Sequence, residues 1–451
     1  MEFSYLTRQA ELKRLDGSSF DVVIVGGGIV GAGIANLLSE NKLRILLVDK
    51  SDFASGTSSN SSKLIHGGLR YLSQGHLMLT RQLLRERNYL LKNVDIVRRL
   101  SFDILVDDTS WKKSSLYFGL LIYNILGGNL ALPHFRKDGY SYQGYRGRFT
   151  YEDATTNDAL LVVYNVVSAV MRGAVAINYM EVTDIRDSDD QVVITLANRF
   201  GDGEYRVKSR LVVNSAGPWI NAIYGKYRSQ RIENLRLSKG SHLMLRREKL
   251  ATEKAIAFRS HIDRRQMFII PRGEVVIVGT TDMFIDSPES SGISDEERKY
   301  IIESVRKVFP SIEENDVVGS YSGVRPLFGS GNDPGKVTRD FHIDMTGKMV
   351  SIMGVKITDY RRATRKISRR IGAILGVKLD LKDSPKVIYR RETDDPIRAA
   401  ISSECALTVD DVLRRRLGSY YEMADQGNSR KSDISVMLSK ITGRQGDIVQ
   451  G

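Results

Sequence analysis

Two kinds of hydrophobic pattern occur near the start of the chain. Residues 20–25 form a run rich in β-branched apolar side chains, which is typical of a strand buried on both faces, and residues 43–48 form a second one. Between them, a glycine-rich stretch at 26–33 passes into a helical pattern that continues to residue 39. A short helix over residues 6–15 precedes the first strand. Strand, helix and strand in this order predict a βαβ unit with parallel strands and a right-handed crossover.

Further along, strand and helix patterns alternate. Residues 77–100 look helical and strongly basic. Strand-like patterns cover residues 175–197 and 211–213, and three antiparallel strands are predicted at 242–245, 267–270 and 275–278. A helix is predicted over 294–309, because Ser294 and Glu297 have the spacing of a capping box. Charged helical patterns over 396–424 and 430–441 predict a small helical domain at the C-terminus.

Composition narrows the class of protein. A chain of 451 residues with 41% hydrophobic and 27% charged residues is typical of a soluble protein of two or three domains. The formal net charge of +13 favours anionic partners, which include nucleic acid, lipid headgroups and phosphorylated small molecules. The single cysteine, Cys405, excludes an internal disulfide and an iron–sulfur cluster and fits a reducing compartment. Residues 1–20 carry several charges and lack an apolar core, so we expect no signal peptide and a cytoplasmic protein.

One uncharged stretch raises the question of a membrane. Residues 114–134 contain no Asp, Glu, Lys or Arg, but the dense apolar part covers only residues 116–126. A membrane span needs about 20 apolar residues, so we reject one here. Trp111, Lys112 and Lys113 precede the apolar part, as in an interfacial helix at an anionic membrane. The alternative is a buried helix of the protein interior. We favour peripheral association with the cytoplasmic face of a membrane.

The glycine-rich stretch carries a dinucleotide motif. Gly26, Gly28 and Gly31 fit G-x-G-x-x-G at the junction of a predicted strand and helix. In such a motif the first glycine allows a tight turn, the second lets the backbone approach a pyrophosphate, and the third lets the helix pack on the strand. The helix N-terminus then favours the phosphate charge. Asp49 ends the second strand, where a carboxylate accepts hydrogen bonds from ribose hydroxyls.

Further motifs resemble a known family. The segments GGGIVGAGIA, TSSNSSKLIHGGLRYL, NSAGPW, KGSHLML, GTTD, SGVRPL and VKITDYR occur in this order. They resemble the FAD-dependent glycerol-3-phosphate dehydrogenases, a family of D-amino-acid-oxidase-like flavoproteins, over residues 15 to 370. The resemblance implies FAD as cofactor and oxidation of sn-glycerol 3-phosphate to dihydroxyacetone phosphate, with the hydride passing from C2 to flavin N5. It leaves the electron acceptor open among quinone, a redox partner protein and oxygen.

The resemblance also implies site residues. It places Arg70, Tyr71, Arg325, Arg339 and Lys356 around the substrate, mostly at the phosphate, which guanidinium groups bind in two-pronged fashion. His242 is the candidate that takes the C2 hydroxyl proton, and Arg325 competes for this role. The residues implied at the cofactor, besides the three motif glycines and Asp49, are Thr57, Ser58, Ser62, Lys63, Leu64, His66, Gly354 and Thr358.

The resemblance implies a division into domains. A Rossmann-like FAD-binding domain takes residues 1–85, 150–225 and 339–383, and a discontinuous antiparallel-sheet substrate domain takes 86–149 and 226–338. Residues 384–451 form the C-terminal helical domain, which is shorter than in many members. The chain departs from the family at Val355, which replaces a glycine beside the flavin, and at Asp49, which replaces a glutamate.

Alternative functions stay open at this point. One is a glycerol-3-phosphate oxidase that uses oxygen, and another is an amino-acid or hydroxy-acid oxidase of the same superfamily. A more distant one is a non-catalytic basic flavoprotein that binds nucleic acid. The basic residues are scattered rather than interleaved with aromatic ones, so we expect no nucleic-acid partner. We expect no metal site, and the sequence leaves a homodimer open.

Overall fold

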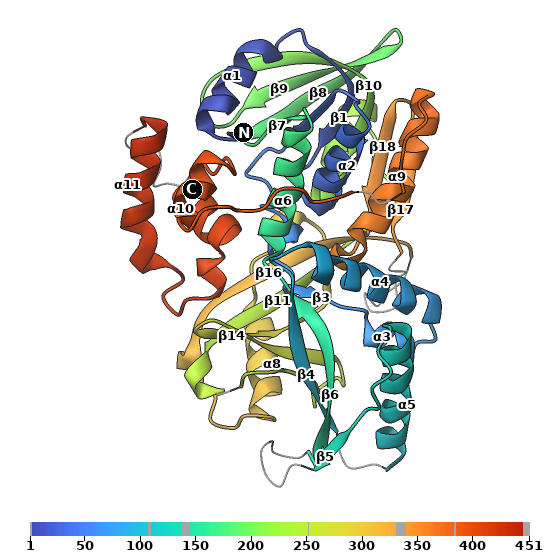
Figure 1. Ribbon diagram of the computed structural model, residues 1–451, viewed down its shortest axis with the longest axis vertical. Coiled ribbons are helices and arrows are strands. Elements are labelled where there is room, and N and C mark those ends of the chain that lie inside the picture. The colour runs from blue at the N-terminus through green and yellow to red at the C-terminus, as the bar shows by residue number, and fades with distance from the viewer. Residues whose placement is uncertain are drawn as a thin grey trace.

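The computed structural model describes residues 2–106, 110–137, 142, 145–250, 252–330, 340–382 and 385–444. Its strands form two sheets that follow one another along the long axis of the molecule (Figure 1). The first sheet has the order β17-β18-β10-β1-β2-β7, with β8 and β9 joined to β10. Its bounds are β1 (Ser19–Val25), β2 (Ile45–Val48), β7 (Val175–Ile177), β8 (Met180–Ser188), β9 (Gln191–Asn198), β10 (Glu204–Asn214), β17 (His342–Thr346) and β18 (Met349–Met353).

The centre of this sheet is the predicted parallel βαβ unit. β1 pairs in parallel with both β2 and β10, and Val22, Val23 and Ile24 have no exposed surface. On one face, α2 (Ile29–Glu40) packs against α6 (Asp158–Met171) and α9 (Tyr360–Leu375). On the other face lie α1 (Tyr5–Leu15) and α7 (Ile220–Arg228). Burial on both faces explains why β1 reads as a nearly continuous apolar run.

The second sheet is mainly antiparallel and has the order β15-β11-β14-β13-β12-β4-β6-β3, with β16 joined to β11 and β5 to β6. Its bounds are β3 (Leu64–Ile65), β4 (Arg98–Val106), β5 (Phe135–Lys137), β6 (Gly147–Thr155), β11 (Leu235–Arg246), β12 (Ala255–Arg259), β13 (Gln266–Arg272), β14 (Val275–Gly279), β15 (Met283–Ile285) and β16 (Val317–Phe328). α8 (Asp295–Arg306) packs on this sheet, and the predicted capping box of Ser294 and Glu297 is confirmed.

Three helices stand beside the second sheet: α3 (Leu69–Ser73), α4 (Leu77–Asn93) and α5 (Ser110–Leu126) (Figure 1). The prediction of a helix over 77–100 was wrong at its end, because the chain from Arg98 onward forms β4 and pairs with β6. Three of the predicted domain limits fall inside elements: the limit at 85/86 lies within α4, the limit at 149/150 within β6, and the limit at 225/226 within α7. No helix in the described part of the chain is long and apolar enough to cross a membrane.

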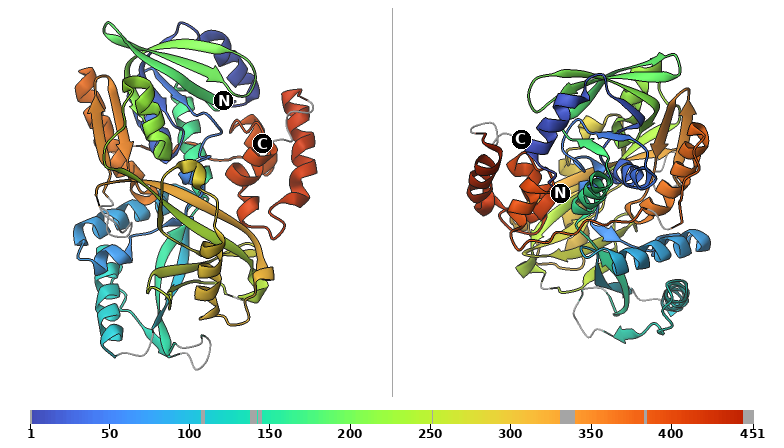
Figure 2. Two further views of the ribbon diagram at one scale, coloured as in Figure 1. Left: turned by 180° about the vertical axis from the view of Figure 1, so that it is seen from behind. Right: turned by 45° about the horizontal axis from the view of Figure 1, so that its top comes forward.

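The C-terminal segment lies against the side of the molecule, next to α6 (Figures 1 and 2). It consists of α10 (Pro396–Ser402), a wider helical turn over Asp411–Leu417 and α11 (Lys431–Thr442). Arg415 and Arg416 reach from this turn to Asp52, which has no exposed side-chain surface. Burial alone raises the pKa of Asp52, but the Arg416 and Arg415 guanidinium groups lower it on balance. This buried cluster ties the C-terminal segment to the loop after β2.

Candidate functional site

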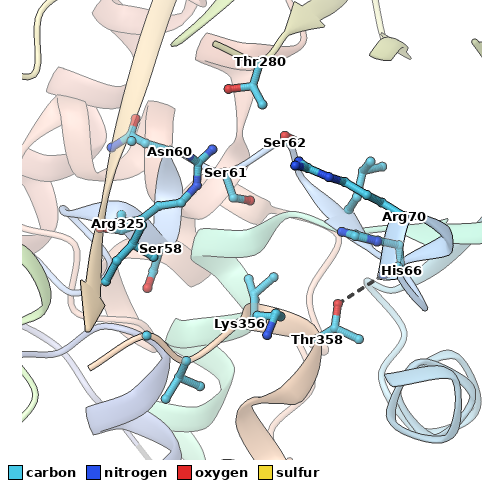
Figure 3. Close-up of a pocket in the computed structure, with 18 of the residues that line it drawn as sticks. Ser58, Asn60, Ser61, Ser62, His66, Arg70, Thr280, Arg325, Lys356 and Thr358 are labelled. Atoms are coloured by element: carbon cyan, nitrogen blue, oxygen red, sulfur yellow. Dashed lines mark hydrogen bonds between the residues drawn. The ribbon is translucent and has the colours of Figure 1, made fainter. Parts of the chain in front are cut away.

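A cavity of about 1930 Å³ connects the first sheet with the second. It begins at the glycine-rich turn and Asp49, passes the loop at 55–62 and reaches Arg325 on β16 and the loop at 354–358. Figure 3 shows that Arg70, Lys356 and Arg325 border this space from separate segments of the chain. The predicted site residues that line it are Gly26, Gly28, Asp49, Thr57, Ser58, Ser62, Leu64, His66, Arg70, Tyr71, Arg325, Gly354, Lys356 and Thr358.

The glycine-rich turn leaves no room for a side chain at Gly26 or Gly31. Gly26 has a φ of +104°, and a Cβ atom there would lie 2.5 Å from the carbonyl oxygen of Ser215. A Cβ atom on Gly31 would lie 2.0 Å from the carbonyl oxygen of Gly26, so this glycine lets α2 pack against the turn. Gly28 is the N-cap residue of α2 and lines the cavity. A helix N-terminus facing the cavity is a site for a phosphate group.

Asp49 lies at the carboxyl end of β2 and lines the cavity. Its Oδ2 atom accepts a hydrogen bond from the Gly27 N–H at 2.7 Å, and its Oδ1 atom accepts one from the Ser51 N–H at 3.0 Å. Burial raises the pKa of Asp49 to about 6, although these backbone hydrogen bonds oppose the shift. The carboxylate is thus held in place by the turn, and a carboxylate oxygen retains capacity for a further donor such as a ribose hydroxyl.

The loop at 57–62 is fastened to both halves of the site. Ser58 Oγ accepts a hydrogen bond from the Ile29 N–H at the start of α2, at 3.0 Å. The Thr57 hydroxyl donates to the carbonyl oxygen of Val324, next to Arg325 on β16. The first contact anchors the loop to the glycine-rich turn, and the second anchors it to the strand that carries Arg325.

Lys63 was predicted at the cofactor, and its side chain is not among those that line the cavity. Its side chain is 2% exposed and pairs with Asp158 at 2.8 Å. The ammonium group also lies 3.7 Å from the ring centroid of Tyr421. Burial lowers the pKa of Lys63 to about 8, and the Asp158 carboxylate opposes this shift. The side chain therefore holds the loop against α6 from behind.

The opposite wall is formed by the segments around His66 and Thr358. The His66 N–H donates a hydrogen bond to Thr358 Oγ1 at 3.1 Å, which joins β3 to the start of α9 (Figure 3). Gly354 has a φ of +76°, a conformation that favours glycine. Val355, the departure from the family pattern, also lines the cavity.

Three of the predicted substrate residues bring positive charge to the cavity. Arg70 is exposed on α3, Lys356 is half-buried, and the side chain of Arg325 is 31% exposed. The Lys356 ammonium group lies 5.3 Å from the ring centroid of Tyr71, so these two residues are also brought together. Arg339 lies outside the described residues. Separate cationic groups around one space suit a phosphate dianion.

His242, the predicted candidate for the C2 hydroxyl proton, lies behind the cavity wall. Its ring is 1% exposed and stacks on Tyr321 at a centroid distance of 4.8 Å. Its Nε2 atom is 2.8 Å from Ser62 Oγ, and Ser62 lines the cavity. Burial lowers the pKa of His242 to about 3, with further lowering from Arg325 and Lys63. His242 reaches the cavity only through the Ser62 hydroxyl.

Sequence reasoning missed a carboxylate beside Arg325. Asp282 is 5% exposed and lies 3.4 Å from Nη1 of Arg325 and 3.4 Å from Nη1 of Arg265. Arg265 also lines the cavity. The sequence carried one signal for this residue, because Asp282 ends the GTTD segment that is part of the family resemblance.

The shape of the cavity fits FAD. The glycine-rich turn brings bare backbone to the cavity at Gly26 and Gly28, and the half-buried Asp49 lies beside it. Serine and threonine hydroxyls and backbone N–H groups continue along the same wall to the cationic residues. Such a sequence of groups suits pyrophosphate, ribose and then a flavin ring next to an anionic substrate.

The profile of the family described as FAD dependent oxidoreductase matches residues 21–349. The aerobic glycerol-3-phosphate dehydrogenase of Staphylococcus aureus (strain MRSA252) is 33% identical over 457 aligned positions, which cover 93% of this chain and 81% of that protein. The FAD complex of glycerol-3-phosphate dehydrogenase from Bacillus halodurans has a TM-score of 0.77 at 22% identity, covering 99% of this chain and 95% of the other. FAD-bound L-alpha-glycerophosphate oxidase from Mycoplasma pneumoniae has a TM-score of 0.65 at 19% identity, and the match covers 83% of this chain and 100% of the other.

Proposed function

Because the chain belongs to the FAD-dependent oxidoreductase family and groups with the aerobic glycerol-3-phosphate dehydrogenases, we propose that it oxidises sn-glycerol 3-phosphate to dihydroxyacetone phosphate. The family match confirms FAD as the predicted cofactor. When bound, FAD supplies the acceptor for the hydride from carbon 2 of the substrate. The observation that carries the proposed substrate is the group of Arg70, Arg325 and Lys356 around the cavity that begins at the dinucleotide turn.

The side chains of this protein bind and orient the substrate in the proposed reaction. Arg70 and Lys356 hold the phosphate, because both bring positive charge and hydrogen-bond donors to the cavity, and the half-buried Lys356 is partly removed from water. Arg325 lies on the second sheet, close to the hydroxyl that loses its proton, and favours the negative charge that develops there. The hydrogen bond between His242 Nε2 and the cavity-lining Ser62 hydroxyl links His242 to the cavity, so proton exchange with His242 passes through the Ser62 hydroxyl.

Anaerobic flavin reduction tests the substrate directly. Stopped-flow mixing of the FAD-loaded protein with sn-glycerol 3-phosphate should bleach the flavin absorbance, whereas glycerol should leave it yellow. Arg325→Ala should lower kcat/KM about 30-fold, because loss of a charged hydrogen bond to a desolvated anion costs about 2 kcal/mol. A flavin that stays oxidised with the phosphorylated substrate would contradict the proposed function.

The electron acceptor separates a dehydrogenase from an oxidase. We propose a quinone or a redox partner protein as acceptor. After reduction by substrate, the flavin should be reoxidised faster by a soluble quinone analogue than by air-saturated buffer, and hydrogen peroxide should be a minor product. Stoichiometric peroxide during turnover would instead favour a glycerol-3-phosphate oxidase.

We also propose that α5 mediates peripheral association with an anionic membrane at its cytoplasmic face. One side of α5 is buried through Leu120 and Tyr123. The other side exposes Phe118, Ile122 and Ile125, which are 60%, 41% and 52% exposed. Trp111 and Lys112 of the predicted interfacial segment have side chains outside the described part of the structure. An exposed apolar stripe on a half-buried helix, in a chain of net charge +13, suits a negatively charged lipid surface.

Vesicle flotation tests this association. The protein should float with vesicles of phosphatidylglycerol and phosphatidylcholine at low salt, and added salt should release part of it. Replacement of Phe118, Ile122 and Ile125 by serine should abolish flotation. The matched control replaces Leu6, Met171 and Val436, which are 58%, 42% and 66% exposed on other helices, and this variant should still float. Absence of bound parent protein at low salt would refute the proposal.

A further inference from the structure

Arg325 lies directly against the backbone of β11. β16 pairs antiparallel with β11, and Arg325 is opposite Ser238 in this register. A Cβ atom on Gly240 would lie 2.3 Å from Nη2 and 2.7 Å from Nη1 of Arg325. Gly240 is not among the residues with a positive φ, so its backbone conformation is open to any residue. Glycine at this position is therefore explained by the space that the guanidinium group occupies.

Asp282 contacts the same guanidinium group. Its Oδ1 atom lies 3.4 Å from Nη1 of Arg325 and also accepts a hydrogen bond from the Ser238 hydroxyl. Its Oδ2 atom lies 3.4 Å from Nη1 of Arg265. Because Asp282 is nearly fully buried, its charge acts on Arg325 with little screening by water. The carboxylate therefore limits the directions in which the guanidinium group can turn.

A second buried carboxylate holds both of these residues in place. Glu297 is 4% exposed, and its Oε1 atom accepts hydrogen bonds from the Ser241 hydroxyl at 2.8 Å and the Thr281 hydroxyl at 2.7 Å. Its Oε2 atom pairs with the ammonium group of Lys239 at 2.8 Å. The chain neighbours of Gly240 and of Asp282 are thus bound to one side chain of α8. This arrangement fixes the strand and the carboxylate relative to each other before any substrate arrives.

We propose that Gly240 and Asp282 are positioning residues that together form a seat for the guanidinium group of Arg325. Gly240 provides the space for the group, and Asp282 provides the charge that sets its direction. The inference rests on the proposed function, in which Arg325 contacts the substrate. A displacement of about 1 Å of such a group lowers the reaction rate by up to about 100-fold, so small changes in the seat should be measurable.

Gly240→Ala and Asp282→Asn test the seat. The added methyl group of Gly240→Ala would first meet the side-chain ends of Arg325 and Thr280, which can move, so this variant should fold and retain FAD. Both variants should lower kcat/KM for sn-glycerol 3-phosphate about tenfold or more, mainly through kcat. FAD content and the visible spectrum should stay as in the parent protein in both variants. The thermal unfolding midpoint should stay unchanged in Gly240→Ala, whereas Asp282→Asn should lower it, because it removes a buried charge partner. Gly292→Ala is the matched control, because a Cβ atom there meets nothing within 4 Å.

Combination with Arg325→Ala separates the seat from a general structural effect. In an Arg325→Ala background, Gly240→Ala should cause no further loss of kcat/KM, because the group that the methyl displaces is gone. If Gly240→Ala lowers kcat/KM in the Arg325→Ala background as much as it does in the parent protein, the proposed seat is refuted. The proposal is also overturned if Arg325→Ala is strongly impaired while Gly240→Ala and Asp282→Asn keep kcat/KM within twofold of the parent. If Arg325→Ala itself leaves kcat/KM unchanged, the role of Arg325 in the proposed function fails instead, and the seat fails with it.

Discussion

Asp52→Asn should loosen the C-terminal segment from the FAD-binding part of the protein. The Asp52 carboxylate accepts hydrogen bonds from Arg415 Nε at 2.8 Å and from Arg416 Nη1 and Nη2 at 2.7 and 2.9 Å. Neither Asp52 nor Arg416 has exposed side-chain surface. The asparagine keeps the volume but removes the charge, so it leaves a buried arginine without this partner.

The expected magnitude follows from the partners that remain. Breaking a buried ion pair costs about 3–5 kcal/mol of unfolding free energy. Arg415 keeps its contacts with Asp410 and Asp411, and Arg416 keeps hydrogen bonds to the carbonyl oxygen of Glu404. The loss of unfolding free energy in Asp52→Asn should therefore lie at the lower end of this range, at about 3 kcal/mol. Because the pKa of Asp52 is lowered from 3.8, this contribution is complete above that pH and is lost as the pH falls through the lowered pKa.

Urea unfolding followed by tryptophan and flavin fluorescence measures this loss with two probes, which also tests for separate transitions of the domains. Asp410→Asn is the matched control. Asp410 binds Arg414 and Arg415 but is 33% exposed, so its replacement should change the unfolding free energy by less than about 1 kcal/mol. A loss below about 1 kcal/mol in Asp52→Asn, equal to that of the control, would refute the reasoning from burial.

Three further predictions concern pH and a helix cap. Because burial lowers the pKa of His242 from 6.5 to about 3, the unfolded chain binds a proton there that the folded chain does not, and the unfolding free energy falls by about 1.4 kcal/mol per pH unit below 6.5. In His242→Gln the unfolding free energy from urea unfolding should depend less on pH between pH 7 and 5. An unchanged slope of unfolding free energy against pH would mean that His242 is not the titrating group. Burial raises the pKa of Asp49 to about 6, so FAD affinity in fluorescence titrations should weaken as the pH falls through this value, and in Asp49→Asn it should be weaker but independent of pH. Equal pH dependence in both proteins would show that Asp49 is not the titrating group. Ser294→Ala should lower the unfolding free energy by about 1 kcal/mol through loss of the α8 cap, and unchanged urea stability would mean that the cap contributes nothing.

The predicted βαβ unit and the cap of α8 were confirmed because both depend on neighbouring residues. A strand buried on both faces needs a run of apolar side chains, and a capping box needs two polar residues three positions apart. The glycine at position 31 was equally local, since a Cβ atom there would collide with the carbonyl oxygen of Gly26, five residues earlier. The end of the basic helix was misplaced, because residues from Arg98 onward form a strand only by pairing with β6.

Side-chain depth in the site was not predictable in the same way. His242 and Lys63 have the chemistry expected of groups that handle protons and phosphates, yet both side chains are buried behind the loop at 57–62. Their burial follows from Tyr321 and Asp158, which are 79 and 95 positions away along the chain. Asp282 was missed for the same reason, because its contact with Arg325 joins segments 43 positions apart.

From residue order alone, one can derive the dinucleotide turn, the chemistry that the family motifs share and the cationic residues available for a phosphate. Which of those residues face the substrate depends on the packing of two sheets that meet at one cavity. Local backbone requirements depend on residues that are adjacent in the sequence. Desolvation and charge pairing act between residues that only the folded chain brings within a few ångströms of each other. For this reason the glycines of the turn were found in the sequence, and the seat of Arg325 emerged only from the tertiary structure.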